Sequence, residues 1–217
     1  MCWGDGIGFL NAIQEGRNVG LMPANKRRQD REEKRAELLT VARRLFIEDG
    51  YEATSMAALA KAAGVAGNTI YWYFTDKDDV LVAVLNAVLG DALTEYAQVA
   101  AAPLEEQLGW VVRQLQQMNR LVSTVHSRAA HARAIDQWHT GFHLITEGLF
   151  RAQLEQAGVD RASIEADIKI GVFAVEGLLT HGLDDAQQQA ICRRLAAQWT
   201  GSTDLHPPAN TGESDAC

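Results

Sequence analysis

The sequence predicts an all-α protein of about nine helices, and three observations lead to this fold class. Only four prolines occur in 217 residues, so helix breakers are rare. The body of the chain is rich in Ala, Leu, Glu, Gln and Arg, which are good helix formers. No segment shows the sustained alternation of apolar and polar residues that is typical of a half-buried strand.

The positions of the helices follow from apolar spacing and from capping residues. From Leu38 to Phe46 apolar residues recur every three or four positions, and Gly50 supplies a stop. Thr75 and Asp76 are N-cap candidates for a long helix that ends at a break over 100–103. The other expected helices cover 31–49, 56–63, 68–74, 104–123, 125–133, 135–157, 161–181 and 186–199.

Composition divides the chain into four parts. Residues 1–25 are expected to be a disordered extension, in which Met22 is a candidate start of the native chain. Residues 26–80 are expected to form a first helical domain and residues 81–200 a second one. The tail, 201–217, is rich in Ser, Thr, Pro, Asn and Asp and is expected to be disordered.

The overall composition argues against several classes of protein. Apolar residues make up 47% and charged residues 22%, close to the averages of soluble globular chains. No apolar run approaches the roughly 18 to 20 residues of a membrane-spanning helix. Cys2, Cys192 and Cys217 are too far apart for a disulfide framework or a metal motif, which favours a cytoplasmic location. Since no Ser-His-Asp order, Gly-rich phosphate loop or HExxH motif occurs, neither an enzyme nor a cofactor is expected.

Charge is distributed unevenly along the chain. The net charge is −8, but residues 24–80 hold ten basic and ten acidic residues, whereas 81–217 hold nine basic and sixteen acidic ones. Positive charge gathers at the start of the first helix, at Lys26, Arg27 and Arg28. Such a basic arm can contact the phosphates of a nucleic acid. The alternative is a solvated helix start with ion pairs along the helix.

Residues 59–73 have the spacing of a helix-turn-helix. Two helices can cross steeply only where a small side chain lies between them, as Ala60 does, and Gly64 allows a tight turn four residues later. An ordinary αα-hairpin shares these features. Three consecutive aromatic residues, Tyr71 to Tyr73, favour the helix-turn-helix, because one short helix cannot bury all three. Of these, Tyr71 is the residue for which a position partly in the core is the strongest alternative to a DNA contact.

A longer run of motifs over residues 35–85 supports this interpretation. Its members are Ala42, Leu45, Phe46, Gly50, Tyr51, Thr54, Ser55, Leu59, Ala60, Ala63, Gly64, Val65, Thr69, Ile70, Tyr71, Tyr73, Phe74, Lys77 and Leu81. In order and spacing they resemble the DNA-binding domain of the TetR family of bacterial transcriptional regulators. The rest of the chain resembles that family only in being helical.

The resemblance implies an N-terminal three-helix DNA-binding domain and a C-terminal helical domain for effector binding and dimerisation. A helix-turn-helix places the first residues of its recognition helix at base edges in the major groove, where Asn can pair with adenine. The expected DNA-contacting residues are Ser55, Gly67, Asn68, Thr69, Tyr71, Trp72, Tyr73 and Lys77, with Lys26, Arg27 and Arg28 of the basic arm.

Three positions depart from the family pattern. Ala66 stands where Ser is usual, so the recognition helix lacks a capping hydroxyl. Gly67 and Ala57 stand where basic residues are frequent. Specificity is therefore expected to depend on Asn68, on the basic arm and on DNA shape.

The resemblance also implies a small-molecule pocket among the middle helices. Amphipathic side chains interrupt the apolar stripes there, and a mostly apolar cavity with a few polar groups suits a small organic ligand. His139 and His143 share a helix face, so a metal site completed by His126 or His131 is a minor alternative, and no metal is expected. The expected pocket residues are Trp110, Met118, His126, Trp138, His139, Phe142 and His143.

The last two helices are expected to meet their copies in a four-helix dimer interface, with intramolecular core as the alternative. Their apolar residues are Ile164, Ile168, Val172, Val175, Leu178, Leu179, Ile191, Leu195 and Trp199.

Together these features predict a ligand-responsive transcriptional regulator. The expected protein is a repressor that binds a palindromic operator as a homodimer and is released by a small-molecule effector. Its expected partners are double-stranded DNA, a second copy of the chain and the effector, with no membrane. The alternative is a DNA-binding protein of the same fold that senses a metal or is regulated by a partner protein.

Overall fold

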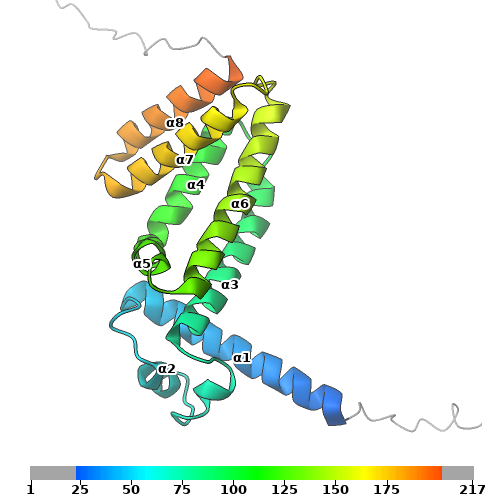
Figure 1. Cartoon of the computed structure of the whole chain (residues 1–217), viewed down its shortest axis with the longest axis vertical. Coiled ribbons are helices and arrows are strands. Elements are labelled where there is room, and N and C mark those ends of the chain that lie inside the picture. The colour runs from blue at the N-terminus through cyan, green and yellow to red at the C-terminus, as the bar shows by residue number, and fades with distance from the viewer. Residues whose placement is uncertain (1–22, 202–217) are drawn as a thin grey trace, which may run out of the picture.

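The computed structural model describes residues 23–201, with side chains from residue 28 onward. Over this part of the chain every regular element is helical, which confirms the all-α prediction (Figure 1). The elements are α1 (Pro23–Glu48), α2 (Met56–Ala62), the 3₁₀-helix η1 (Ile70–Trp72), α3 (Lys77–Val99), α4 (Leu104–Gln117), α5 (Asn119–Ala129), α6 (Arg133–Gln156), α7 (Ile164–Thr180) and α8 (Asp185–Thr200).

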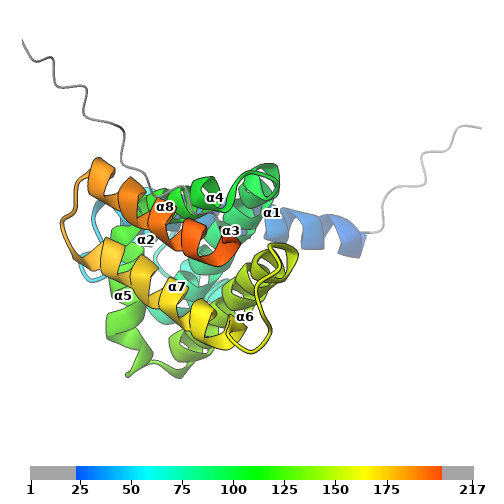
Figure 2. The ribbon, with the colours of Figure 1, turned by 90° about the horizontal axis from the view of Figure 1, so that it is seen from above.

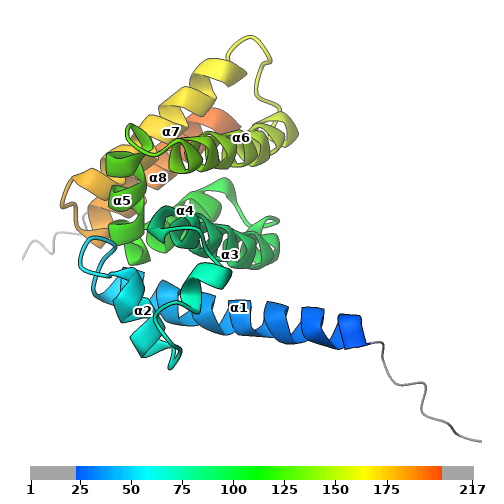
Figure 3. The same ribbon diagram turned by 60° about the horizontal axis from the view of Figure 1, so that its bottom comes forward.

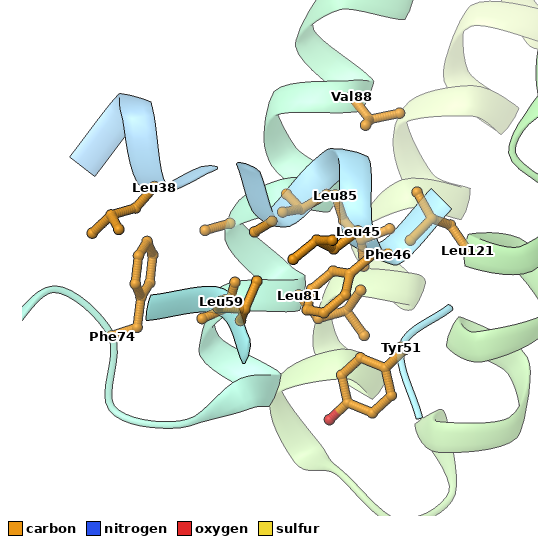
Figure 4. Close-up of a cluster of buried hydrophobic side chains, with 14 of the residues drawn as sticks. Leu38, Leu45, Phe46, Tyr51, Leu59, Phe74, Leu81, Leu85, Val88 and Leu121 are labelled. Carbon is orange, nitrogen blue, oxygen red and sulfur yellow. The ribbon is translucent and has the colours of Figure 1, made fainter. Parts of the chain in front are cut away.

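The N-terminal elements share one hydrophobic core with the start of α3. Phe46 of α1, Leu59 of α2 and Ile70 of η1 are fully buried, and Phe74 and Leu81 pack beside them. Figure 4 shows Phe46, Leu59 and Leu81 converging from three separate helices. Because the buried side chains come from several separate elements, none of these elements forms the core alone.

Local sequence sets the direction of the turn after α2. The Ser55 hydroxyl oxygen accepts a hydrogen bond from the Ala58 N–H at 3.1 Å, so it caps the start of α2. Gly64 then adopts a φ of +66°, in the left-handed region that favours glycine. The chain therefore reverses within a few residues and leads into η1.

Two helix boundaries differ clearly from those predicted. Helix α1 begins at Pro23, eight residues before the expected start at 31, so the backbone of the basic arm is helical. The break expected near residue 124 lies at Met118, where no Gly or Pro marks it. The expected extension and tail fall on 1–22 and 202–217, which lie outside the described residues.

Helix α3 connects the two halves of the molecule. It lies between α1 on one side and α6 on the other (Figure 3). By length and composition it is the one helix among the described residues that passes as a membrane-spanning candidate. Its apolar stripe, however, is buried inside the protein, since Val80, Leu81, Val84 and Leu85 lie in the first core.

A second core fills the C-terminal half. Helix α8 packs along α4 and beside α7 (Figure 2). Ile164, Ile168, Leu178 and Trp199 are buried there, and Val175, Ile191 and Leu195 pack against them, while Val172 and Leu179 line a cavity described below. Of the stripe predicted to form a dimer interface, Ile164, Ile168, Leu178 and Trp199 are therefore buried within the chain itself, where α4 packs along α8.

Gly171 marks the tightest contact in this second core. A Cβ atom there would lie 2.5 Å from Cε1 of Phe150 and 3.2 Å from Trp199. We expect Gly171→Ala to lower the free energy of unfolding by about 1–3 kcal/mol through overpacking. Gly177→Ala is the matched control, since nothing lies within 4 Å of its Cβ position, and it should gain up to about 1 kcal/mol from helix propensity. Equal denaturant midpoints for both variants would contradict this packing.

Candidate functional site

The turn after α2 presents polar backbone and side-chain groups to solvent. Residues 67–69 form a hydrogen-bonded turn, and only a single 3₁₀ turn follows in place of the helix predicted over 68–74. Ala66 carries no hydroxyl and the Thr69 side chain makes no capping bond, so a longer helix is not stabilised at its start. Asn68 is exposed at the front of this turn.

The aromatic residues of η1 divide between core and solvent. In a 3₁₀-helix residues i and i+3 share a face, so Tyr73 lies on the inward side with Ile70 and is half-buried. Tyr71 is 56% exposed and Trp72 is 70% exposed. The alternative that Tyr71 lies partly in the core is therefore excluded, because Tyr73 occupies that position.

Two arginines of α1 contact this segment and hold it in place. The Arg31 guanidinium donates a hydrogen bond to the Trp72 carbonyl at 3.0 Å and lies 5.9 Å from the Tyr73 ring centre. Arg35 lies 5.0 Å from the ring centre of Phe74. Sequence reasoning missed these roles, although the four-residue spacing of the two arginines places them on one helix face. The exposed segment is thus held in place by contacts outside itself.

The other predicted DNA-contacting residues come from the N-cap of α2, the start of α3 and the start of α1. Ser55 is exposed, and its hydroxyl caps α2. The Lys77 ammonium donates to the Tyr51 carbonyl at 2.9 Å, which leaves two of its three N–H donors for other acceptors. Arg28 is exposed near the start of α1, 3.7 Å from Glu32. The side chains of Lys26 and Arg27 lie outside the described residues.

A cavity of about 270 Å³ lies in the C-terminal half, between α3, α4, α5, α6 and α7. All seven residues predicted to form a pocket line it: Trp110, Met118, His126, Trp138, His139, Phe142 and His143. The remaining lining is mostly aliphatic. Tyr96 and Gln107, which also line it, hydrogen-bond to each other at 2.6 Å. The cavity can therefore enclose a small apolar molecule.

Polar groups that remain available to such a molecule gather at one place. Nε2 of His139 lies 3.1 Å from Nε2 of His143, so one of these atoms donates and the other accepts. The ring centre of His126 is 5.0 Å from that of His139. Glu176 of α7 lines the same wall. His131, by contrast, is exposed and does not line the cavity.

This cluster does not amount to a metal centre. Across the described part of the chain, no three His, Cys, Asp or Glu side chains come together in a way that could hold a metal ion. A close pair of imidazoles is better suited to hydrogen bonding with a ligand, because each neutral ring carries one donor and one acceptor nitrogen.

Comparisons with known proteins agree with the geometry of the helix-turn-helix around α2 and η1. The model of the family described as bacterial regulatory proteins, tetR family, matches residues 38–84. Over 57 residues the chain is 47% identical to the HTH-type transcriptional regulator AcrR of Shigella flexneri. Residues 38–84 are therefore a TetR-family segment. Over 74 residues it is also 32% identical to the HTH-type transcriptional repressor KstR2 of Rhodococcus jostii.

The two sequence matches cover a smaller part of the chain than the matches to solved structures do. They cover 26% and 34% of this chain, and this chain covers only 26% of AcrR and 36% of KstR2. Solved structures resemble the fold more widely. A transcriptional regulator from Rhodococcus sp. Rha1 has a TM-score of 0.65 at 16% identity, covering 80% of this chain and 99% of that one. A TetR transcription regulator from Haloarcula marismortui has a TM-score of 0.64 at 18% identity, covering 78% and 97%.

A network of charged groups joins the cavity helix α5 to the segment that matches the TetR family. Arg128 of α5 donates to both carboxylate oxygens of Asp78, at 2.9 and 2.7 Å. Asp78, at the start of α3, also accepts a hydrogen bond from the Tyr51 hydroxyl at 2.5 Å. Arg128 and Lys77 lie over the Tyr51 ring, 4.9 and 4.0 Å from its centre. No sequence signal reveals this network, since Arg128 and Asp78 are 50 residues apart.

Protonation states within this network are fixed by its hydrogen bonds. Burial raises the pKa of Asp78, but hydrogen bonds from Arg128 and Tyr51 outweigh burial, so the net pKa is below its ordinary value. Burial and the neighbouring Asp78 raise the pKa of Tyr51, so its phenol stays protonated and can donate. Both contacts therefore persist near neutral pH.

The histidine cluster predicts a pH-dependent stability. Burial lowers the pKa of His139, and charge on His143 and His126 lowers it further, against the opposite effect of Glu176 and Asp136. As the pH falls through about 6.5, His139 therefore binds a proton in the unfolded chain before it does so in the folded chain. We expect the free energy of unfolding to decrease from there towards the folded pKa, by at most about 1.4 kcal/mol per pH unit for this one proton.

Denaturant unfolding of the wild type and of His139→Gln between pH 7.5 and 5 checks this expectation. The free energy of unfolding should fall less on acidification in His139→Gln than in the wild type. Parallel curves for the two proteins would show that His139 does not titrate as described.

Proposed function

We propose that this chain is a ligand-responsive transcriptional regulator that binds a palindromic operator as a homodimer and acts as a repressor. The observation that carries the proposal is the exposed segment with Asn68, Tyr71 and Trp72 at the end of a helix-turn-helix. Exposed apolar side chains that lie together among polar residues often mark a binding site. The names of the relatives AcrR and KstR2, a regulator and a repressor, support this role over an enzymatic one.

DNA binding in this proposal combines one base-reading group with several phosphate contacts. Asn68 reads a base edge, with Gly67 letting the backbone approach closely, and Thr69 contacts a base or a phosphate. The hydroxyls of Tyr71, Tyr73 and Ser55 and the ammonium of Lys77 reach phosphates, and Trp72 packs on sugar or a thymine methyl. Lys26, Arg27 and Arg28 add salt-dependent affinity along the helical arm.

The proposed response to an effector runs through the two helices that line the cavity and touch the DNA-binding domain. Helix α3 begins five residues after η1 and lines the cavity from Leu85 to Tyr96. Helix α5 lines it with His126 and holds Asp78 of α3 through Arg128. A ligand that moves either helix changes the spacing of the two recognition segments in a dimer and weakens operator binding.

The residues that line the cavity predict the chemical character of an effector. The apolar walls favour a mostly apolar organic molecule, and the imidazoles of His126, His139 and His143 favour one with a polar group at one end. A thermal-shift screen of such compounds is a direct route to candidates, because a ligand bound only by the folded state raises the melting temperature.

Isothermal titration tests the proposed coupling. An effector from the screen is titrated into the protein alone and into the protein saturated with operator DNA. By linkage, DNA must weaken effector binding by the same factor by which the effector weakens DNA binding. Equal effector affinities in the two titrations would refute a ligand-released repressor and would favour regulation by a partner protein.

A further inference from the structure

One charged group in the wall of the cavity has no partner within the described part of the chain. This group is the carboxylate of Glu176 on α7. The Glu176 backbone carbonyl accepts a hydrogen bond from the Thr180 hydroxyl at 3.1 Å, but no described residue forms an ion pair or a hydrogen bond with its carboxylate. The other acidic residue of the wall, Glu147, is paired with Lys169 at 2.7 Å. The charge of Glu176 is therefore left to be balanced by a bound molecule.

The wall of the cavity contains no permanent cation. Among the described residues that line it, no Lys or Arg occurs. Glu176 is close enough to His139 to raise its pKa, but burial outweighs this effect and holds the pKa of His139 below its ordinary value. This imidazole is therefore neutral at neutral pH and does not balance the carboxylate. The cavity is thus apolar over most of its wall and negative where it is charged.

Uncharged groups of the cavity also favour a positive charge. Each neutral imidazole carries one acceptor nitrogen, and an ammonium group has only donors. The rings of Trp138 and Phe142 stack with their centres 5.4 Å apart, and Phe142 meets His143 edge-on at 5.7 Å. Since the faces of aromatic rings carry partial negative charge, they attract ammonium groups. Acceptor nitrogens and aromatic rings therefore adjoin one another in this cavity.

We propose that the cavity takes a lipophilic amine, whose apolar body packs on the aliphatic and aromatic walls and whose positively charged nitrogen pairs with the Glu176 carboxylate. The proposal rests on the proposed function, because it specifies the chemical class of the effector to which the regulator responds. The proposed function leaves open the charge of the polar end of that molecule.

Anionic and neutral molecules of the same shape fit the cavity less well. A carboxylate would share an apolar cavity with Glu176 and meet no cation, and a buried charge without a partner is costly. An alcohol would keep the contacts with the walls but form no ion pair. An amine neutralises Glu176, although its own desolvation offsets part of the gain. The order of affinity is therefore amine, alcohol, carboxylate.

Three probes with the same apolar body test this order: 4-phenylbutylamine, 4-phenylbutan-1-ol and 4-phenylbutyrate. Near neutral pH the amine is positively charged, as lysine is, and the acid is negatively charged. Isothermal titration of the full-length wild type measures the three dissociation constants. We expect the amine to bind on the order of 10-fold more tightly than the carboxylate, with the alcohol between them.

Variants of one side chain assign the preference to Glu176. Glu176→Gln keeps the shape of the side chain and removes its charge, so the ratio of amine to alcohol affinity should fall towards one. Glu176→Asp keeps the charge and should keep the preference. Glu165→Gln is the matched control on the same helix, because Glu165 is exposed, pairs with Arg151 and does not line the cavity. It should bind all three probes as the wild type does.

Circular dichroism checks the helical content of every variant, and the wild-type order of affinity is a test in itself if Glu176→Gln does not fold. A carboxylate that binds the wild type as tightly as the amine would overturn the proposal. So would an unchanged preference in a folded Glu176→Gln protein, or the absence of binding by all three probes at millimolar concentration.

A failure of the proposed function gives a different result, because operator binding is measured without any probe. A protein that prefers the amine through Glu176 but binds no duplex DNA would support the ligand class and contradict the regulator. A protein that binds operator DNA but shows no preference for the amine would support the regulator and overturn the ligand class.

Discussion

Replacing Arg128 with alanine is expected to lower the free energy of unfolding by about 1–3 kcal/mol and to uncouple the cavity from the DNA-binding domain. The substitution removes both hydrogen bonds from the guanidinium to Asp78 and leaves that partly buried carboxylate with the Tyr51 hydroxyl. It also removes the cation over the Tyr51 ring. Helix α5 then keeps its cavity residues but loses its polar attachment to the start of α3.

The measurement has a stability part and a coupling part. Denaturant unfolding gives the first. For the second, operator affinity is measured with and without an effector, and the ratio should fall towards one in Arg128→Ala. Arg151→Ala is the matched control, because Arg151 also makes two contacts to one carboxylate, at 2.6 and 2.9 Å, but to an exposed glutamate within the C-terminal half.

Exposed ion pairs contribute little, so the control should lose less than about 1 kcal/mol and keep its effector response. If Arg128→Ala responds to effector as strongly as Arg151→Ala does, coupling does not run through this network. In that case α3, which lines the cavity directly, would have to carry it alone.

Replacing Trp72 with alanine is expected to weaken operator binding by about 10- to 100-fold while leaving the fold intact. Trp72 is 70% exposed, so its side chain contributes little to the core, and its backbone carbonyl still accepts the hydrogen bond from Arg31. Fluorescence anisotropy with labelled operator measures the affinity, and thermal unfolding measures the stability.

Ile70→Ala is the contrasting control two residues earlier. Ile70 is buried in the first core, so its truncation should cost about 2–5 kcal/mol of stability and impair DNA binding only through loss of structure. Full operator affinity in a folded Trp72→Ala protein would show that this exposed aromatic residue serves some other purpose.

The helices and the N-terminal core were predictable because their signals are local. The apolar spacing from Leu38 to Phe46, the capping carboxylate of Asp76 and the turn at Gly64 each act over a few residues, and the structure follows them. The pocket residues were predictable for a related reason. Amphipathic side chains such as Trp138 and His139 interrupt otherwise apolar stripes, and those positions face the cavity.

Features that depend on which element covers another were not predictable. The apolar stripe of α8 looks the same in sequence whether it meets α4 or a second copy, and the structure places it against α4. The Arg128–Asp78 pair joins residues whose neighbours along the chain give no hint of it. The same holds for Tyr71 and Tyr73, whose division between solvent and core depends on the 3₁₀ geometry of η1.

The central claim, that the exposed turn and η1 read DNA, is tested most directly by selecting bound sequences from a random duplex library with the wild type and with Asn68→Ala in parallel. For the wild type the account predicts an inverted repeat whose half-sites face the same side of the duplex. For Asn68→Ala it predicts the same repeat with base preference relaxed at one position in each half-site. No enriched repeat for the wild type, or an unchanged preference at every position in the variant, would contradict it.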